Sequence, residues 1–173
     1  MQAVYEVMSS PLGEVLVAEI NRELTALFFV SKETLPRRLE KLSRYYPFLK
    51  LAEGHIQNAK NVTRLLNGDD VTEDIPISKF VFECCSDFRK AVYEQLLRIP
   101  RGCTKSYAEV AAEMGRPTAY RAVAQACGAN VLCVIIPCHR VIASNGTLHG
   151  YGGGLDKKKK LLEMESSQSS LKK

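Results

Sequence analysis

Long apolar runs, paired cysteine spacings and histidines are all scarce or missing in this sequence. The longest uninterrupted apolar stretches, such as residues 131–137, are far shorter than the roughly 20 residues that cross a bilayer, so we expect no membrane span. No basic segment followed by a long apolar one stands near Met1, which argues against a secretory signal. The composition, 46% apolar and 25% charged, predicts one packed domain or two small ones.

The six cysteines all lie at or beyond residue 84, and none of them forms a C-x-x-C pair. Cys84 and Cys85 are adjacent, a spacing that suits neither a disulfide framework nor a tetrahedral zinc site. Only three histidines are available as imidazole ligands. We therefore expect reduced thiols, an intracellular location and no structural metal.

Charge divides unevenly along the chain. Residues 1–83 carry ten basic and twelve acidic side chains, a net charge of −2, whereas the net charge is +4 in residues 84–155 and +3 in residues 156–173. The basic excess favours a polyanionic partner for the C-terminal half, although many proteins of this charge bind no nucleic acid.

The first third of the chain alternates apolar and polar residues, which predicts a three-stranded antiparallel meander over residues 3–30. Helical spacing follows from Lys32 and again around Ile56. Nothing in this region suggests chemistry. We predict an α/β (α+β) fold with two domains: a small structural α/β domain with a short antiparallel sheet over residues 1–79, and a mainly helical domain over residues 80–173.

The second half contains the signals of a helix-turn-helix. An amphipathic helix is expected over 88–99, and a capping box at 106–109 begins a further helix that ends at Gly115. The next helix is expected from Pro117 to about Cys127, with Gly128 as its stop, in a winged-helix-like arrangement. Its outer strip is polar, with Thr118, Arg121 and Gln125. Such a strip suits a DNA groove, but solvated polar faces are equally common.

Residues 131–136 form a continuous apolar run, which predicts a strand buried on both faces. A last helix is expected from Asp156, with Lys157–Lys160 on its exposed face. Residues 166–173 are expected to form a frayed tail.

Cys138 follows the buried run and is a candidate nucleophile, because cationic neighbours such as His139 and Arg140 favour the thiolate. The alternative is a small buried hydrophobe, as we assume for Cys84, Cys85 and Cys133. Neighbouring side chains on an extended chain point to opposite sides. His139 is therefore expected to act on Cys138 through a water, or after a local bend.

Residues 136–141 read I-P-C-H-R-V, which is similar to the active-site motif of the O6-alkylguanine-DNA alkyltransferases. The resemblance covers about residues 80–166 in order and spacing and is weak over residues 1–79. Its further elements are Ser106-Tyr107, Arg121-Ala122-Val123, Asn130, Tyr151-Gly152-Gly153-Gly154-Leu155, Leu161-Leu162 and Glu165.

The resemblance implies a single-turnover DNA repair protein that rotates a damaged guanine out of duplex DNA and transfers its alkyl group irreversibly to Cys138. His139 would take the thiol proton through a water, and Glu165 would orient the imidazole. Arg121 would enter the duplex as a finger. The implied partner is double-stranded DNA containing O6-alkylguanine, with no membrane and no cofactor. We expect a monomer, nuclear in a eukaryote and cytoplasmic in a prokaryote.

The remaining site residues divide into two groups. The resemblance places two more beside the chemistry, Asn130 tying the helix to the active-site turn and Tyr107 near the leaving base. The candidates for contact with substrate or DNA, besides Arg121, are Thr118, Gln125, Ala122, Tyr151, Gly152, Gly153, Lys158 and Val141.

This sequence departs from the family pattern at Ala124 and Gln125, where small glycines are usual, and at Val131, where a proline is common. Three other classes stay open. A non-catalytic alkyltransferase-like DNA-damage-binding protein typically lacks the acceptor cysteine. A cysteine hydrolase needs a distant histidine and an oxyanion hole. A helix-turn-helix regulator would leave the cysteine motif without a purpose.

Overall fold

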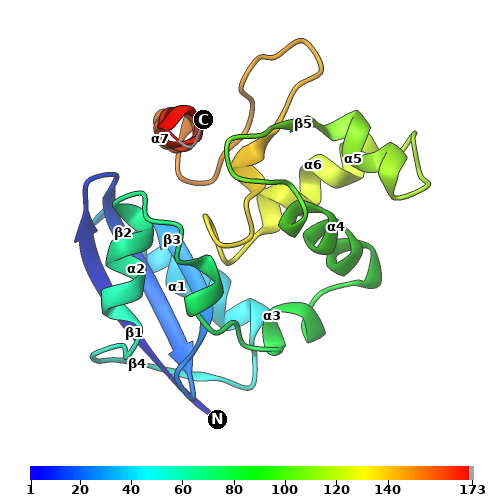
Figure 1. The fold of residues 1–173 in the computed structure, drawn as a ribbon. Helices are drawn as coiled ribbons and strands as arrows, with labels where there is room; N and C mark the ends of the chain where they lie inside the picture. The colour runs from blue at the N-terminus through cyan, green and yellow to red at the C-terminus, as the bar shows by residue number, and fades with distance from the viewer. Residues whose placement is uncertain (172–173) are drawn as a thin grey trace. The chain divides into compact units, whose positions relative to one another are not determined.

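The computed structural model describes residues 1–171, and side chains as far as Gln168. The chain forms two compact units, Met1–Cys84 and a second that starts at Cys85 (Figure 1). Each unit is described by itself below. The predicted domain boundary, between residues 79 and 80, lies five residues before this division. It stays a prediction.

The first unit is built on a four-stranded sheet of order β3-β2-β1-β4 (Figure 1). Three consecutive antiparallel strands, β1 (Gln2–Ser10), β2 (Gly13–Ile20) and β3 (Glu23–Phe29), confirm the predicted meander. The two-residue loop between β2 and β3 places Asn21 and Arg22 at positive φ, as a tight hairpin requires. The strand β4 (Lys50–Glu53) was not predicted, because only its parallel pairing with β1 defines so short a segment.

Helices complete the first unit. The core of the unit combines buried residues of β2 and β3 with buried residues of the helical segments, among them Leu42 and Leu66, and the predicted helical segments appear in the structure. The helical elements are α1 (Leu35–Tyr45), α2 (Ala59–Leu66), the 3-10 turn η1 (Thr72–Asp74) and α3 (Phe80–Glu83).

The second unit is mainly helical. Its elements are α4 (Asp87–Leu97), β5 (Lys105–Ser106), α5 (Tyr107–Glu113), α6 (Tyr120–Ala129), the 3-10 turn η2 (Cys138–Arg140), β6 (Val141–Ile142) and α7 (Leu155–Leu171). Helices α5 and α6 pack together as the helix-turn-helix predicts (Figure 1). The two short strands pair in parallel, so that β5, just before α5, lies beside β6, just after η2. No helix among the described residues is long and apolar enough to cross a membrane.

The predicted capping box begins α5. Ser106 Oγ accepts a hydrogen bond from Glu109 N at 3.1 Å, and Glu109 Oε2 accepts one from Ser106 N at 2.6 Å. Both bonds join residues only three apart, so the sequence pattern is sufficient to predict them.

Two helix boundaries differ from the expectation. Helix α6 begins at Tyr120 rather than Pro117, because Ala119 N first closes a turn on Arg116 O at 2.9 Å. It also continues through Gly128, which is exposed, and ends where Asn130 leaves the helical conformation. A glycine lowers helix stability, but it does not end a helix whose other residues are well packed.

The C-terminal helix corrects two further predictions. Residues 166–171, expected to be a frayed tail, continue α7, while residues 172–173 lie outside the described part of the chain. The buried Glu165 and a 2.5 Å hydrogen bond from Arg101 Nη2 to Gln168 Oε1 hold this end of the helix to its unit. Within the lysine run expected to face solvent, Lys158 is completely buried.

Candidate active site

Residues 131–137 form a buried series of turns instead of the predicted strand. Leu132 O accepts a hydrogen bond from Ile136 N at 3.0 Å, and Cys133 O accepts one from Ile135 N at 2.9 Å. Between them, Val134 has a φ of 71°. The apolar run correctly predicted burial, but a packed turn satisfies the same pattern, and periodicity cannot distinguish the two.

Asn130 connects the two ends of this turn. Its Oδ1 accepts a hydrogen bond from Leu132 N at 2.9 Å, and its Nδ2 donates to Ile136 O at 2.9 Å. The same Nδ2 lies 3.2 Å from Cys138 Sγ. The side-chain amide thus satisfies buried backbone groups that a neighbouring strand would otherwise pair, and it offers a donor to the sulfur.

Cys138, His139 and Arg140 form the 3-10 turn η2, so the chain bends locally at the motif. Cys138 N donates to Ile136 O at 2.8 Å, which closes a tight turn around Pro137. The Cys138 side chain is almost completely buried, and His139 is fully buried.

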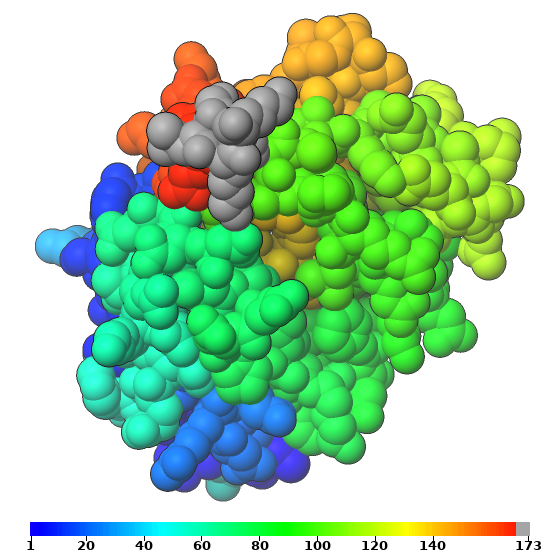
Figure 2. Space-filling model, viewed as in Figure 1, coloured from blue at the N-terminus to red at the C-terminus, as the bar shows by residue number. Residues whose placement is uncertain are grey.

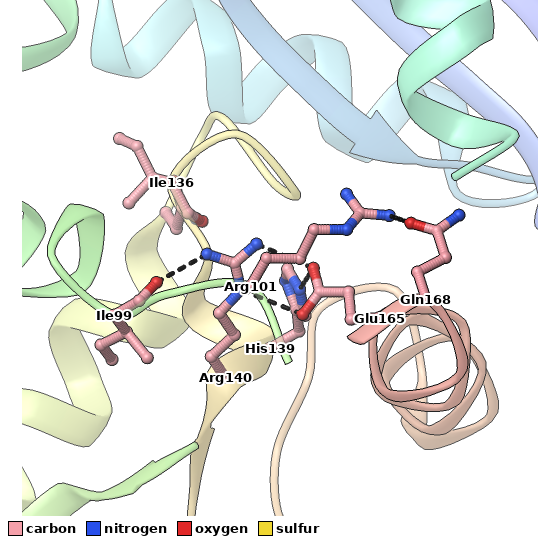
Figure 3. A network of polar contacts seen from close by, with 8 residues as sticks. Ile99, Arg101, Ile136, His139, Arg140, Glu165 and Gln168 are labelled. Carbon is pink, nitrogen blue, oxygen red and sulfur yellow. Dashed lines mark hydrogen bonds and ion pairs between the residues drawn. The ribbon is translucent and has the colours of Figure 1, made fainter. Parts of the chain in front are cut away.

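Glu165 of α7 joins both residues that follow the cysteine (Figure 3). His139 Nε2 lies 2.8 Å from Glu165 Oε1. Arg140 donates to both carboxylate oxygens, from Nε at 3.0 Å and from Nη2 at 2.9 Å, and its Nη1 donates to Ile99 O at 2.7 Å. Burial alone would raise the pKa of Glu165, but the hydrogen bonds from His139 and Arg140 lower it to about 2. The carboxylate is therefore ionised at neutral pH.

Burial lowers the pKa of His139 below its ordinary value, although Glu165 opposes the shift. The imidazole is therefore neutral near pH 7. Because Glu165 accepts the proton of Nε2, the lone pair is on Nδ1, a buried atom with no hydrogen-bond partner among the described residues. A neutral, oriented imidazole of this kind is a proton acceptor.

A hydrogen bond from Cys133 lowers the pKa of Cys138, with smaller contributions from Asn130 and the charge of Lys158, and together they outweigh the effect of burial. Sequence reasoning missed Cys133, which we assumed to be inert. No spacing rule relates residues five apart in a turn, so only the fold could show this contact. The combination of groups favours a thiolate in a buried site.

Lys158 lies against the same turn. Its Nζ donates to Val141 O at 2.6 Å and to His149 O at 3.1 Å, and it stands 5.9 Å from the centre of the Tyr107 ring. Tyr107 Oη donates to His149 O at 3.4 Å. Burial raises the pKa of Tyr107 to about 12, and that of Tyr151 well above its usual range, so both phenols stay protonated donors.

The expected DNA-contacting residues lie on a separate surface, on α6 and just before it. Arg121 and Gln125 are exposed on the outer face of α6, Ala122 is half-buried beside them, and Thr118 is exposed in the preceding turn. Gly152 and Gly153 belong to the loop that leads into α7, after the surface loop of residues 143–150 (orange in Figure 2).

The chain is similar to known proteins over nearly its whole length. Residues 87–167 match the family described as 6-O-methylguanine DNA methyltransferase, DNA binding domain, and residues 3–78 match the ribonuclease-like domain of the same name. A methylated-DNA–protein-cysteine methyltransferase of Mycobacterium leprae is 37% identical over 164 residues, which cover 93% of this chain and 91% of that protein.

Solved structures give the same result. A crystal structure of Mycobacterium tuberculosis O6-methylguanine methyltransferase aligns with a TM-score of 0.77 and 32% identity, covering 99% of both chains. Mycobacterium tuberculosis OGT in complex with DNA aligns with a TM-score of 0.75 and 34% identity, covering 97% of this chain and 94% of that one.

Proposed function

This chain belongs to the 6-O-methylguanine DNA methyltransferase family, and on that premise we propose that Cys138 is the acceptor of the transferred group. The protein is a DNA repair methyltransferase that moves an alkyl group from DNA onto its own cysteine. The observation that carries the residue assignment is the buried pair of His139 and Glu165 that directly follows Cys138 in the turn, together with the Asn130 amide at the sulfur.

The reaction begins with a proton transfer. The Cys138 thiol gives its proton to Nδ1 of His139 through a bridging water, and Glu165 stabilises the imidazolium that results. Asn130 Nδ2, at 3.2 Å, stabilises the negative charge that stays on the sulfur. The ionised Glu165 is held in place by Arg140, so it does not need to move during this step.

The thiolate then attacks the alkyl carbon bound to the guanine oxygen. A carbon–sulfur bond forms while the carbon–oxygen bond breaks, and the electron pair leaves with the guanine. The protonated Tyr107 hydroxyl is suited to donate a hydrogen bond to the leaving base, which finally recovers one proton. The product is a thioether, a stable carbon–sulfur linkage, so each molecule reacts once.

DNA is the partner, and we propose that the specific substrate is O6-alkylguanine in duplex DNA. Cys138 is only 5% exposed, so a base that remains stacked cannot reach it and must be rotated out of the helix. The exposed Arg121 on α6 is suited to enter the duplex, where the small side chain of Ala122 permits close approach to a groove.

We further propose that the protein acts as a monomer, since Asn130, His139 and Glu165, to which we assign the activation of Cys138, all belong to the second unit of one chain. An intracellular location is proposed because an acceptor thiol must stay reduced to react. The presence of Cys138 in a complete activating environment is evidence against a purely DNA-damage-binding module.

Mass spectrometry tests the assignment directly. After incubation with duplex DNA containing O6-methylguanine, the peptide that carries Cys138 should gain one methyl in place of a hydrogen. Cys138→Ser should show no gain but retain DNA binding, because phosphate and groove contacts supply the affinity. Cys103→Ser, which removes an exposed thiol, serves as the matched control and should react like the unmodified protein.

Two results would contradict the proposal. Methyl transfer by Cys138→Ser would mean that another residue is the acceptor. DNA binding by the unmodified protein without any gain in mass would favour the binding module.

A further inference from the structure

Helix α6 begins with an aromatic side chain that faces solvent. Tyr120 is the first residue of the helix and is 44% exposed. A single exposed ring is common on protein surfaces and indicates nothing by itself. The residues around it on α6 give it a meaning, because they form the face from which we propose that Arg121 enters the duplex.

Arg121 lies directly against this ring. Its Cζ stands 5.9 Å from the centre of the Tyr120 ring, which is a cation–π contact. Both side chains project from the first turn of α6, so they reach the same part of a partner. The N-terminal residues of a recognition helix are also the ones that reach the bases of DNA.

The rest of the helix ridge that carries Tyr120 is flat. Residues four apart lie one above the other on a helix, so Tyr120 is followed on its ridge by Ala124 and Gly128, and both are exposed. A Cβ atom at Gly128 would meet nothing within 4 Å, so packing inside the protein does not require a glycine there. Of these three residues only Tyr120 has a large side chain, and the other two let a partner come close.

The charge of this region favours DNA over a second copy of the chain as that partner. Helix α6 contains no acidic residue, and residues 84–155 carry a net charge of +4. Two such faces repel each other, whereas the phosphates of a duplex attract them. The bases of DNA also present flat apolar faces, which a phenol ring matches.

We propose that Tyr120 is a second side chain that contacts the opened duplex. Its ring stacks on the base beside the position that Arg121 enters and helps to keep the damaged base outside the helix. Removing a guanine from the stack exposes the faces of the flanking bases to water, and an apolar ring that covers them lowers the free energy of the open duplex. This inference rests on the proposed function, since it takes a duplex with an extruded base as the substrate.

Two measurements on the full chain test the role of Tyr120. The first is equilibrium binding to a duplex containing O6-methylguanine, made in a Cys138→Ser background so that no transfer occurs. The second is the ratio of the single-turnover rate with that duplex to the rate with the free base O6-benzylguanine, because a general loss of structure lowers both rates and leaves their ratio the same. The variants are Tyr120→Ala and Tyr120→Phe. Leu97→Ala, 42% exposed at the end of α4, is the matched control.

Tyr120→Ala should weaken binding about fivefold to tenfold and lower the rate ratio by a similar factor, as expected for the loss of one stacked ring. The weakening should be equal at low and high salt, since a phenol neutralises no phosphate. It should persist in an Arg121→Ala background, because the ring makes its own contact with DNA. Tyr120→Phe should bind like the unmodified protein, and Leu97→Ala should change neither quantity.

Four results would overturn the proposal. The first is unchanged binding and an unchanged ratio in Tyr120→Ala. The second is the absence of any further loss in the Arg121→Ala background, because the ring would then act only by holding the arginine. The third is a Tyr120→Phe variant as weak as Tyr120→Ala, which would assign the effect to the hydroxyl. The fourth is sedimentation that shows Tyr120→Ala breaking a complex of two chains while DNA binding stays the same.

The two proposals fail in different ways. If the unmodified protein does not methylate Cys138, the proposed function is wrong, whereas binding in the Cys138→Ser background still decides whether the Tyr120 ring contacts DNA.

Discussion

Each unit of the chain buries one glutamate among the described residues, and the partners of the two carboxylates differ. Glu19 of β2 accepts hydrogen bonds from the backbone N–H groups of Gln57 and Asn58, both at 2.8 Å, and from Asn58 Nδ2 at 2.7 Å. Glu165 of α7 is held by the imidazole of His139 and the guanidinium of Arg140.

The difference separates a structural carboxylate from one that can take part in chemistry. The donors around Glu19 keep their protons at all ordinary pH values, so that carboxylate can only tie the start of α2 to the sheet. His139 is a neutral imidazole that can accept a proton from the thiol, so Glu165 can influence a reaction through it. The two carboxylates are therefore equally buried but differ in role, because only Glu165 has a partner that can accept a proton.

The largest effect should come from breaking the titrating pair. His139→Gln and Glu165→Gln should slow reaction with O6-benzylguanine, the larger effect being about 100-fold, because general-base catalysis contributes about this much. The double variant should be little slower than the worse single one, since the two groups act as a unit. Single-turnover rates across pH for all three variants test this. Effects that multiply would show that Glu165 acts independently of His139.

The second largest effect should be on the stability of the protein in acid, to which Glu165 contributes. Its pKa falls from the ordinary 4.5 to about 2 in the folded protein, so its contribution to stability is complete above pH 4.5 and is lost as the pH falls through about 2. We expect the ionised carboxylate to contribute about 2 kcal/mol to the free energy of unfolding. This is less than the full pKa shift would give, because solvent screens part of the interaction. Urea unfolding from pH 5 to pH 2 should show a weaker pH dependence for Glu165→Gln than for Glu163→Gln, an exposed control on α7. Equal dependence in both variants would contradict the shift.

Glu19→Gln should change stability without changing chemistry. An amide in place of the carboxylate weakens three hydrogen bonds and places N–H groups against N–H donors, which should cost about 1.5 kcal/mol. The free energy of unfolding should fall while the rate with O6-benzylguanine stays the same. Glu14→Gln, exposed on the same strand, should alter neither quantity. A slower reaction in Glu19→Gln would remove the distinction between the two carboxylates.

The smallest effect concerns the exposed face of α6, which carries Arg121. Arg121→Ala should slow repair of duplex DNA about fivefold but leave the reaction with O6-benzylguanine within about twofold, because the arginine acts on the duplex and not on the thiol. Lys159→Ala, exposed on α7, provides a comparison for the loss of one positive charge. Equal losses on both substrates would show that Arg121 does not assist extrusion.

Local signals explain most of the fold that could be predicted. The meander and the Ser106 capping box depend on residues that are neighbours in the chain, so their patterns are complete in the sequence. The strand expected at residues 131–136 was wrong, because an apolar run reports burial but not backbone conformation. The strand β4 was missed, because parallel pairing with β1 stabilises it from a distance.

The candidate site divides in the same way, into residues that the sequence identifies and contacts that only the fold creates. The I-P-C-H-R-V motif identifies Cys138 and His139 from the sequence, since a reactive thiol and its base stand side by side in it. Glu165 was expected only from the family resemblance, and the structure places its Oε1 2.8 Å from His139 Nε2 across 26 residues of sequence. The burial of Lys158, which the sequence pattern placed on a solvated face, depends on two backbone carbonyls that only the folded loop presents.

The sequence by itself determined which residues carry reactive groups, and it determined the β1–β3 meander and the start of α5, because propensity, capping and hydrophobic period act over a few residues. The tertiary structure alone decided which of these groups meet. The ionised state of Glu165 arises from the hydrogen bonds that His139 and Arg140 make with it, and these outweigh the opposing effect of burial only because the fold brings the three side chains together.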